Sequence, residues 1–367
     1  MTRRIRLGIV GLSADPSHCT NFIHKLPLTT TPLSENYEIV ALSMSSSEKA
    51  VAAAIAHGLP QEKGYHSVDT LARDPDVDLV VVSVKVPRRT ELAMAAINAG
   101  KDVYVEWPFA SNLVEAEALA QRAREKQVKS MVGLQTRLAP QVLKMKEIIQ
   151  AGALGRILAT NLVVTDDLFM KFHADKRHSH DKANGANIVT IAGGHLIDTM
   201  VFLLGEFSTL HAQTSMQFPK PILRDAQGNA KSGQFNDAPD TFTLHGRMGD
   251  QNIPTSVCMY SHPPTTPNLF QWIVTGERGS LKMEGPSLMI HAIPPRLLHT
   301  VAGTEGAASW QEIQLETTTV QGAEYQAWME NDMARIVTLD DAVIRYRMID
   351  AIFRSSESGE PMSYSCT

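Results

Sequence analysis

The first 135 residues alternate short apolar, β-branched runs with longer segments of helical periodicity. Such runs predict buried strands, and the amphipathic segments between them predict covering helices. The predicted strands are residues 5–12, 38–43, 79–84, 102–106 and 129–133, and the predicted helices are residues 47–56, 88–99 and 112–126. Alternating strands and helices form a parallel sheet that binds ligands beyond the carboxyl ends of its strands. We therefore expect a doubly wound α/β domain over residues 1–135.

The pattern changes after Pro140. A predicted helix at residues 141–150 precedes a β-rich stretch, which one apolar helix near residues 195–204 interrupts. The clearest strands are residues 241–247, 255–260 and 270–275, residues 217–239 are a long excursion rich in turn formers, and residues 340–354 form a closing helix. We expect an α+β domain over residues 136–367 with a large open, mostly antiparallel sheet. The open face of that sheet predicts a homodimer or homotetramer.

Composition narrows the class of protein. Of 367 residues, 43% are hydrophobic and 20% are charged, which is typical of soluble globular chains. A net charge of -5, without long basic runs, argues against direct binding to nucleic acid or to an anionic membrane. Three scattered cysteines suit neither a disulfide framework nor a metal site, and no run predicts a signal peptide or a membrane span. We expect a cytoplasmic protein, with the nucleus left open, and no metal.

A glycine turn follows the first predicted strand. The run Gly8-Ile9-Val10-Gly11-Leu12-Ser13 places Gly11 where a tight turn from strand to helix is needed. Ser13 and Pro16 stand where a full phosphate-binding fingerprint has its second and third glycines. We interpret Gly11, Leu12 and Ser13 as contacts to a dinucleotide pyrophosphate, and the alternative is a glycine that serves the turn alone.

The end of the second strand bears on the choice of cofactor. Residues 42–47 contain no acidic side chain to accept the ribose hydroxyls of NAD. The hydroxyls of Ser45 and Ser46, with Lys49 nearby, can instead hold a 2'-phosphate, which favours NADP with NAD possible. The alternative is that Ser45 to Ser47 only cap the next helix.

Several motifs, in order along the chain, resemble those of the Gfo/Idh/MocA oxidoreductases. They are Gly8-Ile9-Val10-Gly11, residues 99–103 leading into Glu106-Trp107-Pro108, Arg137-Leu138-Ala139-Pro140, residues 152–157, Gly194-His195-Leu196-Ile197-Asp198, residues 276–281 and the closing helix at residues 349–359. The resemblance implies an N-terminal Rossmann domain, an α+β C-terminal domain, a dinucleotide in the crevice, and dimers or tetramers. It adds Val84, Glu106, Trp107, Pro108 and Arg137 to the expected cofactor contacts, although Arg137 could instead serve as a structural clasp.

Two positions depart from that family's pattern. Its first motif usually reads Glu-Lys-Pro, and here the lysine is replaced by Trp107. The family also often carries an aspartate four residues before its active-site histidine, and here that residue is Ile191. The Glu-Trp pair resembles the branch of the fungal galactose-regulon repressor. That branch implies an alternative function, a non-catalytic, dinucleotide-sensing co-regulator whose partner is a transcription factor.

His195 is the strongest candidate for proton transfer, because hydride exchange with a carbonyl needs a nearby group that gives or takes a proton. Asp198 follows one helical turn later and could orient the His195 ring. Lys85, after the third predicted strand, could place an ammonium in the same crevice or simply be solvated. Trp107 cannot carry a proton at neutral pH, so it would form a wall over the nicotinamide or pack in the core.

We therefore expect an NAD(P)-dependent oxidoreductase that acts on a carbonyl, alcohol or imine of a small molecule. A second alternative is a non-redox lyase or isomerase on the same scaffold, with His195 as its base. His173, His178 and His180 could bind a metal, although a solvated polar loop suits their sequence better.

Overall fold

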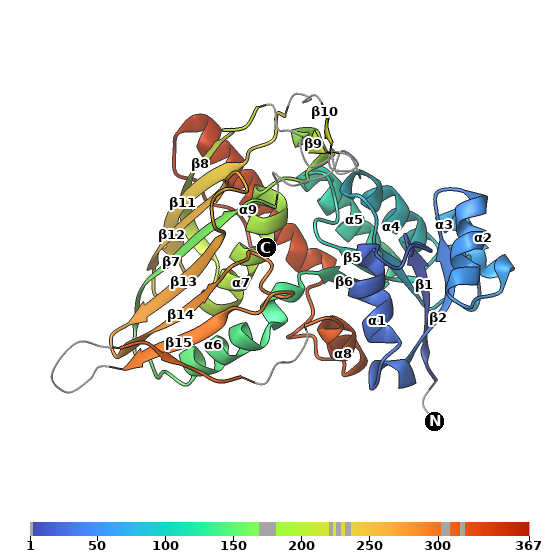
Figure 1. The fold of residues 1–367 in the computed structure, drawn as a ribbon, viewed down its shortest axis with the longest axis horizontal. Coiled ribbons are helices and arrows are strands. Elements are labelled where there is room, and N and C mark those ends of the chain that lie inside the picture. Colours follow the sequence, from blue (N-terminus) through green and yellow to red (C-terminus); the bar gives the residue numbers. More distant parts are fainter. Residues whose placement is uncertain are drawn as a thin grey trace. The chain divides into compact units, whose positions relative to one another are not determined.

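The computed structural model describes residues 3–168, 181–219, 223–224, 229–231, 236–301, 309–315 and 320–366 (Figure 1). The chain forms two compact units: unit 1 is Met1–Leu134 with Gln321–Val343, and unit 2 is Gln135–Val320 with Ile344–Thr367. The sequence placed residues 321–343 in the second domain. In the structure Tyr325 packs into the core of unit 1, and Val132 N donates to Val337 O at 2.8 Å.

Unit 1 is built on a six-stranded parallel sheet in the order β3-β2-β1-β4-β5-β6. The strands are β1 Ile5–Val10, β2 Tyr37–Ser43, β3 Gly64–Tyr65, β4 Leu79–Val82, β5 Asp102–Glu106 and β6 Ser130–Gly133. The parallel α/β prediction is confirmed. β1 and β4 each end two residues before the predicted limit, and the short β3 was not predicted.

Helices connect these strands and pack on the sheet. They are η1 Asn21–Lys25, α1 Leu26–Leu28, η2 Leu33–Glu35, α2 Ser47–Ala56, η3 Gln61–Lys63, α3 Val68–Arg73, η4 Val86–Arg88, α4 Arg89–Asn98, α5 Leu113–Lys126 and α8 Ala323–Met329. At the start of α5 the Asn112 side chain accepts from Glu115 N at 3.0 Å, and Glu115 Oε2 accepts from Ser111 N at 3.0 Å. The first bond satisfies an amide that has no partner within the helix, as the capping-box spacing predicts, and the second holds Ser111, the residue before the N-cap Asn112.

The first helix begins later than the glycine turn suggests. Helical structure starts only at Cys19, eight residues after Gly11, and the first labelled element, η1, begins at Asn21. Between them Asp15 Oδ1 accepts from Ser17 N at 2.9 Å and from Ser17 Oγ at 2.7 Å, which closes a local turn around Pro16. This turn competes with helix formation, and Pro16 has no amide hydrogen to donate.

Unit 2 contains an eight-stranded sheet in the order β16-β15-β14-β13-β7-β12-β11-β8. Its strands are β7 Ile157–Asp166, β8 Phe207–Ser215, β11 Thr241–Met248, β12 Ile253–Ser261, β13 Leu269–Gly276, β14 Gly279–Gly285, β15 Arg296–Val301 and β16 Gln311–Glu312. Among the strands of this sheet that the structure describes, only β7 and β12 pair in parallel, so the prediction of a mostly antiparallel sheet is confirmed. In the described part of the excursion at residues 217–239, β9 Leu223–Arg224 pairs with β10 Ala230–Lys231.

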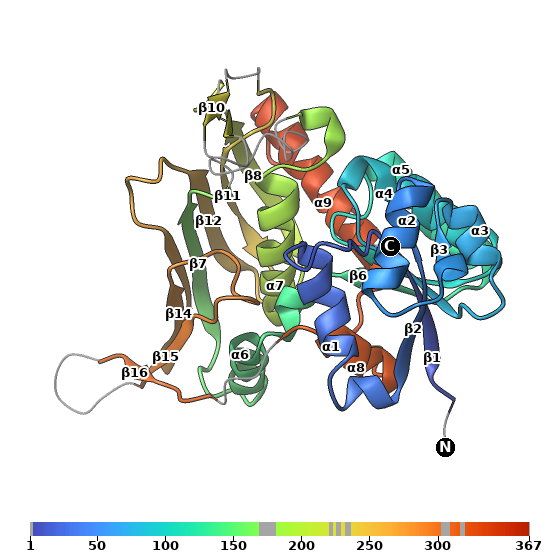
Figure 2. The same cartoon turned by 45° about the vertical axis from the view of Figure 1, so that its right-hand side comes forward.

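The helical segments of unit 2 are η5 Gln135–Leu138, α6 Pro140–Gln150, η7 Lys182–Asn184, η8 Val189–Gly193 and α7 Gly194–Leu204, and α9 Leu339–Ser358 enters it from unit 1. Figure 2 shows α7 alongside one face of the sheet. A Cβ on Gly193, just before α7, would come 3.0 Å from the Phe242 ring of β11, so a glycine there permits the close approach.

The stretch Lys182–Leu204 is long and apolar enough to cross a membrane by length and composition. This differs from the expectation that no segment reaches that length. Seventy-eight per cent of its apolar window is buried inside the protein, as in the core helix of a soluble domain.

Candidate functional site

The turn after β1 brings Gly11 to the carboxyl edge of the sheet in unit 1. Gly11 has a φ of 95°, and a Cβ there would lie 2.3 Å from Ser83 O. Its amide donates to Ser43 O at the end of β2 at 2.9 Å. Any side chain at Gly11 would therefore displace the turn on which the predicted phosphate contacts depend.

Leu12 and Ser13 follow in a fixed conformation. Leu12 is fully buried, and Ser13 O accepts from Asn21 Nδ2 at 3.2 Å. His57 Nε2 lies 2.9 Å from the same carbonyl, and His57 Nδ1 lies 2.9 Å from Lys25 Nζ. Because an ammonium can only donate, Nδ1 accepts and Nε2–H donates to Ser13 O. Burial lowers the pKa of His57, which favours this neutral ring.

The residues after β2 are compatible with both sequence predictions, contact to a 2'-phosphate and capping of the next helix. Ser46 is the N-cap of α2, and its hydroxyl accepts from Lys49 N at 3.3 Å. Ser45 is exposed, and no carboxylate lies between Ser43 and Ser47. Capping is thus observed for Ser46, while Ser45 stays a prediction for phosphate contact.

Arg89, at the start of α4, ties together the ends of β4 and β5. Its Nε donates to Val84 O at 2.7 Å, and its Nη1 donates to Glu106 O at 3.0 Å and to Pro108 O at 2.8 Å. Three of the predicted cofactor residues are thus held by one guanidinium. Arg89 was not predicted from the sequence, because an arginine at a helix start carries no signal of the carbonyls that it will contact in the folded unit.

Trp107 and Lys85 differ sharply in exposure. Trp107 is 3% exposed, follows β5, and packs against Phe109 with ring centroids 6.3 Å apart. Lys85 is exposed at the N-cap of η4. The packing alternative for Trp107 is therefore observed, and its role as a wall over the nicotinamide stays a prediction. The role of Lys85 also stays a prediction.

Glu106 belongs to a buried polar cluster in unit 1. Its Oε1 lies 2.9 Å from Nε2 of the fully buried His24, whose Nδ1 lies 2.8 Å from Tyr325 Oη. Tyr104 stands edge-on to His24 with centroids 5.2 Å apart, and its hydroxyl donates to Glu324 Oε1 at 3.4 Å. Segments about 300 residues apart in the chain build this cluster, so no local spacing of residues could predict it.

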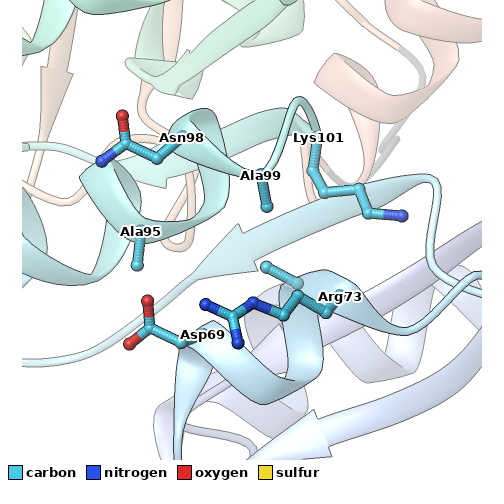
Figure 3. A pocket seen from close by; sticks show the side chains of 7 residues that line it. Asp69, Arg73, Ala95, Asn98, Ala99 and Lys101 are labelled. Atoms are coloured by element: carbon cyan, nitrogen blue, oxygen red, sulfur yellow. The ribbon is translucent and has the colours of Figure 1, made fainter.

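Unit 1 has a pocket of about 390 Å³ at the amino edge of its sheet, opposite the carboxyl edge where Gly11 lies. The pocket lies where α3 and α4 end and just before β5 begins. Figure 3 shows its lining, which includes Asp69, Arg73, Asn98 and Lys101. Lys101 Nζ donates to Asp74 O at 3.0 Å and to Val77 O at 2.6 Å, so its ammonium caps neighbouring backbone. None of the predicted site residues lines this pocket.

In unit 2, His195 lies in the first turn of α7 and is half-buried. Its Nδ1 is 3.3 Å from the hydroxyl of Thr136, which is 1% exposed. The same hydroxyl is 3.4 Å from Nδ1 of His291, and the two imidazole centroids are 5.9 Å apart. Thr136 and His291 were not predicted from the sequence, because η5, α7 and the loop after β14 meet only in the folded unit.

Asp198 does not orient His195 as the spacing suggested. Its two carboxylate oxygens accept from Arg137, with Nε to Oδ2 at 2.9 Å and Nη2 bonded to Oδ1. Arg345 Nε of α9 lies 3.9 Å from Oδ1. A bidentate guanidinium satisfies a buried carboxylate better than one imidazole nitrogen does, and so the pair fixes η5 against α7. This favours the structural alternative for Arg137.

His173, His178 and His180 lie outside the described residues. Within the described ranges, no group of three or more His, Cys, Asp or Glu side chains is placed to hold a metal ion.

Comparison with known proteins defines the family. Residues 5–134 match the model of an oxidoreductase family with an NAD-binding Rossmann fold, and residues 140–285 match the model of the Gal80p C-terminal domain. The chain is 78% identical over 364 residues to the dehydrogenase aclE of Aspergillus oryzae, with 99% of each chain covered. The chain belongs to the Gfo/Idh/MocA oxidoreductases.

Other proteins similar to this Gfo/Idh/MocA member include a regulatory protein and a levoglucosan dehydrogenase. The galactose/lactose metabolism regulatory protein GAL80 of Saccharomyces cerevisiae is 27% identical over 294 residues, which cover 77% of this chain and 67% of the regulator. A levoglucosan dehydrogenase solved with NADH and levoglucosan superposes with a TM-score of 0.81 at 19% identity, over all of both chains. At that identity the structural likeness shows the fold alone.

Proposed function

We propose that this protein is an NAD(P)-dependent oxidoreductase acting on a carbonyl, alcohol or imine of a small molecule. In this proposal unit 1 binds the dinucleotide, and His195 of unit 2 gives or takes the proton. The observation that carries the proposal is the 78% identity, over 99% of the chain, to a protein named a dehydrogenase. The oxidoreductase family model over residues 5–134 supports it.

The carboxyl edge of the sheet in unit 1 fits a dinucleotide. The positive φ of Gly11 turns the chain sharply after β1, and Arg89 fixes the ends of β4 and β5 beside it. The lack of a carboxylate between Ser43 and Ser47 favours NADP, because an acidic side chain there would repel a 2'-phosphate. A bound dinucleotide would supply the hydride acceptor or donor.

Proton transfer then falls to His195. Trp107 offers only an indole N–H, which does not ionise near neutral pH. The imidazole of His195 can hold or release a proton there, and Thr136 fixes its Nδ1. In alcohol oxidation His195 would take the hydroxyl proton, and in carbonyl reduction it would return one.

Substitution of His195 tests this role. We expect His195→Gln to lower turnover of an identified substrate about 10²- to 10⁴-fold, the range for loss of a general acid or base, and to leave dinucleotide affinity unchanged. Reduction or oxidation of the nicotinamide, followed by absorbance across a panel of carbonyls, alcohols and imines, is the measurement. His245→Gln, at an exposed position in β11, is the matched control. Unchanged turnover in His195→Gln would refute the assignment.

A regulatory function is the second candidate, because residues 140–285 match the Gal80p C-terminal domain and Trp107 and Ile191 replace two family positions. It predicts dinucleotide binding without turnover of any panel member, together with dinucleotide-dependent capture of a transcription factor. Turnover that depends on His195 would exclude a purely regulatory function.

A further inference from the structure

Thr136 places one buried hydroxyl between two histidines of unit 2. Its Oγ1 lies 3.3 Å from His195 Nδ1 and 3.4 Å from His291 Nδ1, and the two rings are tilted by 30° with centroids 5.9 Å apart. Both imidazoles are half-buried, whereas Thr136 is 1% exposed. The hydroxyl is thus the inner point of a three-residue chain.

The chemistry of a hydroxyl constrains the two rings. A hydroxyl has one proton to donate and lone pairs to accept with, and a neutral imidazole carries its proton on one nitrogen only. Thr136 can therefore donate to only one Nδ1 and must accept from the other. When both bonds form, one ring is protonated at Nδ1 and has its lone pair on Nε2, while the other ring has the opposite tautomer.

We propose that Thr136 joins His195 and His291 in a proton relay, an inference that rests on the proposed function of His195. In alcohol oxidation the substrate O–H bond breaks as His195 Nε2 takes the proton, while the hydride leaves to the oxidised dinucleotide. The Nδ1 proton of His195 passes to Thr136 Oγ1, and the threonine proton passes to His291 Nδ1. His195 ends neutral, His291 ends as the imidazolium, and carbonyl reduction runs the sequence backwards.

The two partners of His195 have distinct parts in this relay. Thr136 and His291 are positioning residues, because they act on the substrate only through His195. The distances of 3.3 and 3.4 Å are long for a hydroxyl, and hydrogen bonds of this kind tighten when the reacting complex forms. The relay moves positive charge away from the reacting atoms without requiring His195 to leave its position.

The first experiment needs neither substrate nor cofactor. Long-range proton–nitrogen NMR on ¹⁵N-histidine protein, at a pH where both rings are neutral, reports the tautomer of each ring, and His195→Gln and His291→Gln assign the signals. We expect opposite tautomers in the wild type, their loss in Thr136→Val, and their retention in Thr136→Ser, which keeps the hydroxyl. The same tautomer in both wild-type rings, or no change in Thr136→Val, would overturn the proposal.

Kinetics tests the use of the relay. We expect Thr136→Val and His291→Gln each to lower kcat about 10- to 100-fold with little change in KM, and the double variant to lose no more than either alone. Thr136→Ser should restore kcat to within a few-fold of wild type. Unchanged kcat in His291→Gln would overturn the relay alone. Absence of turnover in the wild type would overturn the proposed function and, with it, the catalytic use of the relay.

Discussion

At the scale of single residues, Glu324 shows how burial changes the chemistry of a side chain. It is 5% exposed, and burial, with the nearby Glu106, raises its pKa from 4.5 to about 8, although the Tyr104 hydroxyl donates to it. A pKa of about 8 favours the protonated carboxyl in the folded protein at neutral pH, whereas the unfolded chain favours the ionised carboxylate.

This difference predicts a pH dependence of stability. Between pH 4.5 and about 8 the folded state holds a proton that the unfolded state has released, so the free energy of unfolding falls as the pH rises. One such group contributes a slope of up to about 1.4 kcal/mol per pH unit. We expect Glu324→Gln to flatten the dependence of the free energy of unfolding on pH between pH 4.5 and about 8, as measured by urea unfolding. Compared with the wild type, the variant should therefore be more stable at pH 8 than it is at pH 5. Glu330→Gln is the control, because Glu330 is exposed and directly follows α8, the helix that carries Glu324.

Residue types and their order in the sequence predicted which residues belong to the candidate site. They did not predict which partners those residues contact. Gly11 and His195 were selected because their residue types suit a sharp turn and proton transfer. The partner of Asp198 could not be predicted, because helical spacing relates it to His195 whereas Arg137, 61 residues earlier, takes both carboxylate oxygens. His291 was missed for the same reason, since its partner Thr136 lies 155 residues away in sequence.

At the scale of elements, the buried guanidinium of Arg345 links α9 to α7 and to Glu206, the residue before β8. Arg345 is 3% exposed, bonds Glu206 through Nη2, and lies 3.9 Å from Asp198. Tyr364 donates to the other Glu206 oxygen at 2.7 Å. Removal of the arginine would leave two carboxylates with less compensation than burial requires.

We expect Arg345→Met to lower the free energy of unfolding by about 3 kcal/mol, because breaking a buried ion pair from one side costs more than the pair itself contributes. Arg354→Met, on the same helix, removes an ion pair to Asp350 whose side chains are 53% and 43% exposed, and should cost less than about 1 kcal/mol. Chemical denaturation of both variants makes the comparison. Equal losses would show that the buried network is not what holds α9.

Hydrophobic periodicity predicted elements where local pattern and packing agree. The strand at residues 102–106 and the helix at residues 47–56 have the predicted bounds. The first helix begins later than the glycine turn suggests, because Asp15 and Ser17 form a local hydrogen-bonded turn in place of a helix. The spacing of the strands carries no information about this competition between turn and helix.

At the scale of the whole molecule, the chain passes between its two units after residues 134, 320 and 343. If the dinucleotide binds the folded protein and not the unfolded chain, NADPH at a hundred times its Kd should add about 2.7 kcal/mol to the free energy of unfolding. We expect NADPH to raise the Tm more than NADH does, as measured by thermal melting.

The matched variants act on the end of β2. Ser45→Asp should weaken NADPH binding about tenfold or more and spare NADH, because a carboxylate repels a 2'-phosphate, whereas Ser45→Ala should change both little. Equal effects of Ser45→Asp on the two dinucleotides would contradict the assignment. A homo-oligomer and a cytoplasmic location also stay predictions. The exposed apolar residues Tyr260 and Leu269, which both pair with Thr165 of β7 and so share one face of the large sheet, support the former.

The sequence by itself determined the parallel sheet of unit 1, the mostly antiparallel sheet of unit 2, the glycine turn and the family, because each depends on residues that are close in the chain or on motifs in a fixed order. Only the tertiary structure decided that residues 321–343 pack with unit 1, that Arg89 fixes the ends of β4 and β5, and that Thr136 stands between His195 and His291. These features join segments far apart in sequence. Burial and hydrogen-bond satisfaction select such contacts, and local pattern cannot encode them.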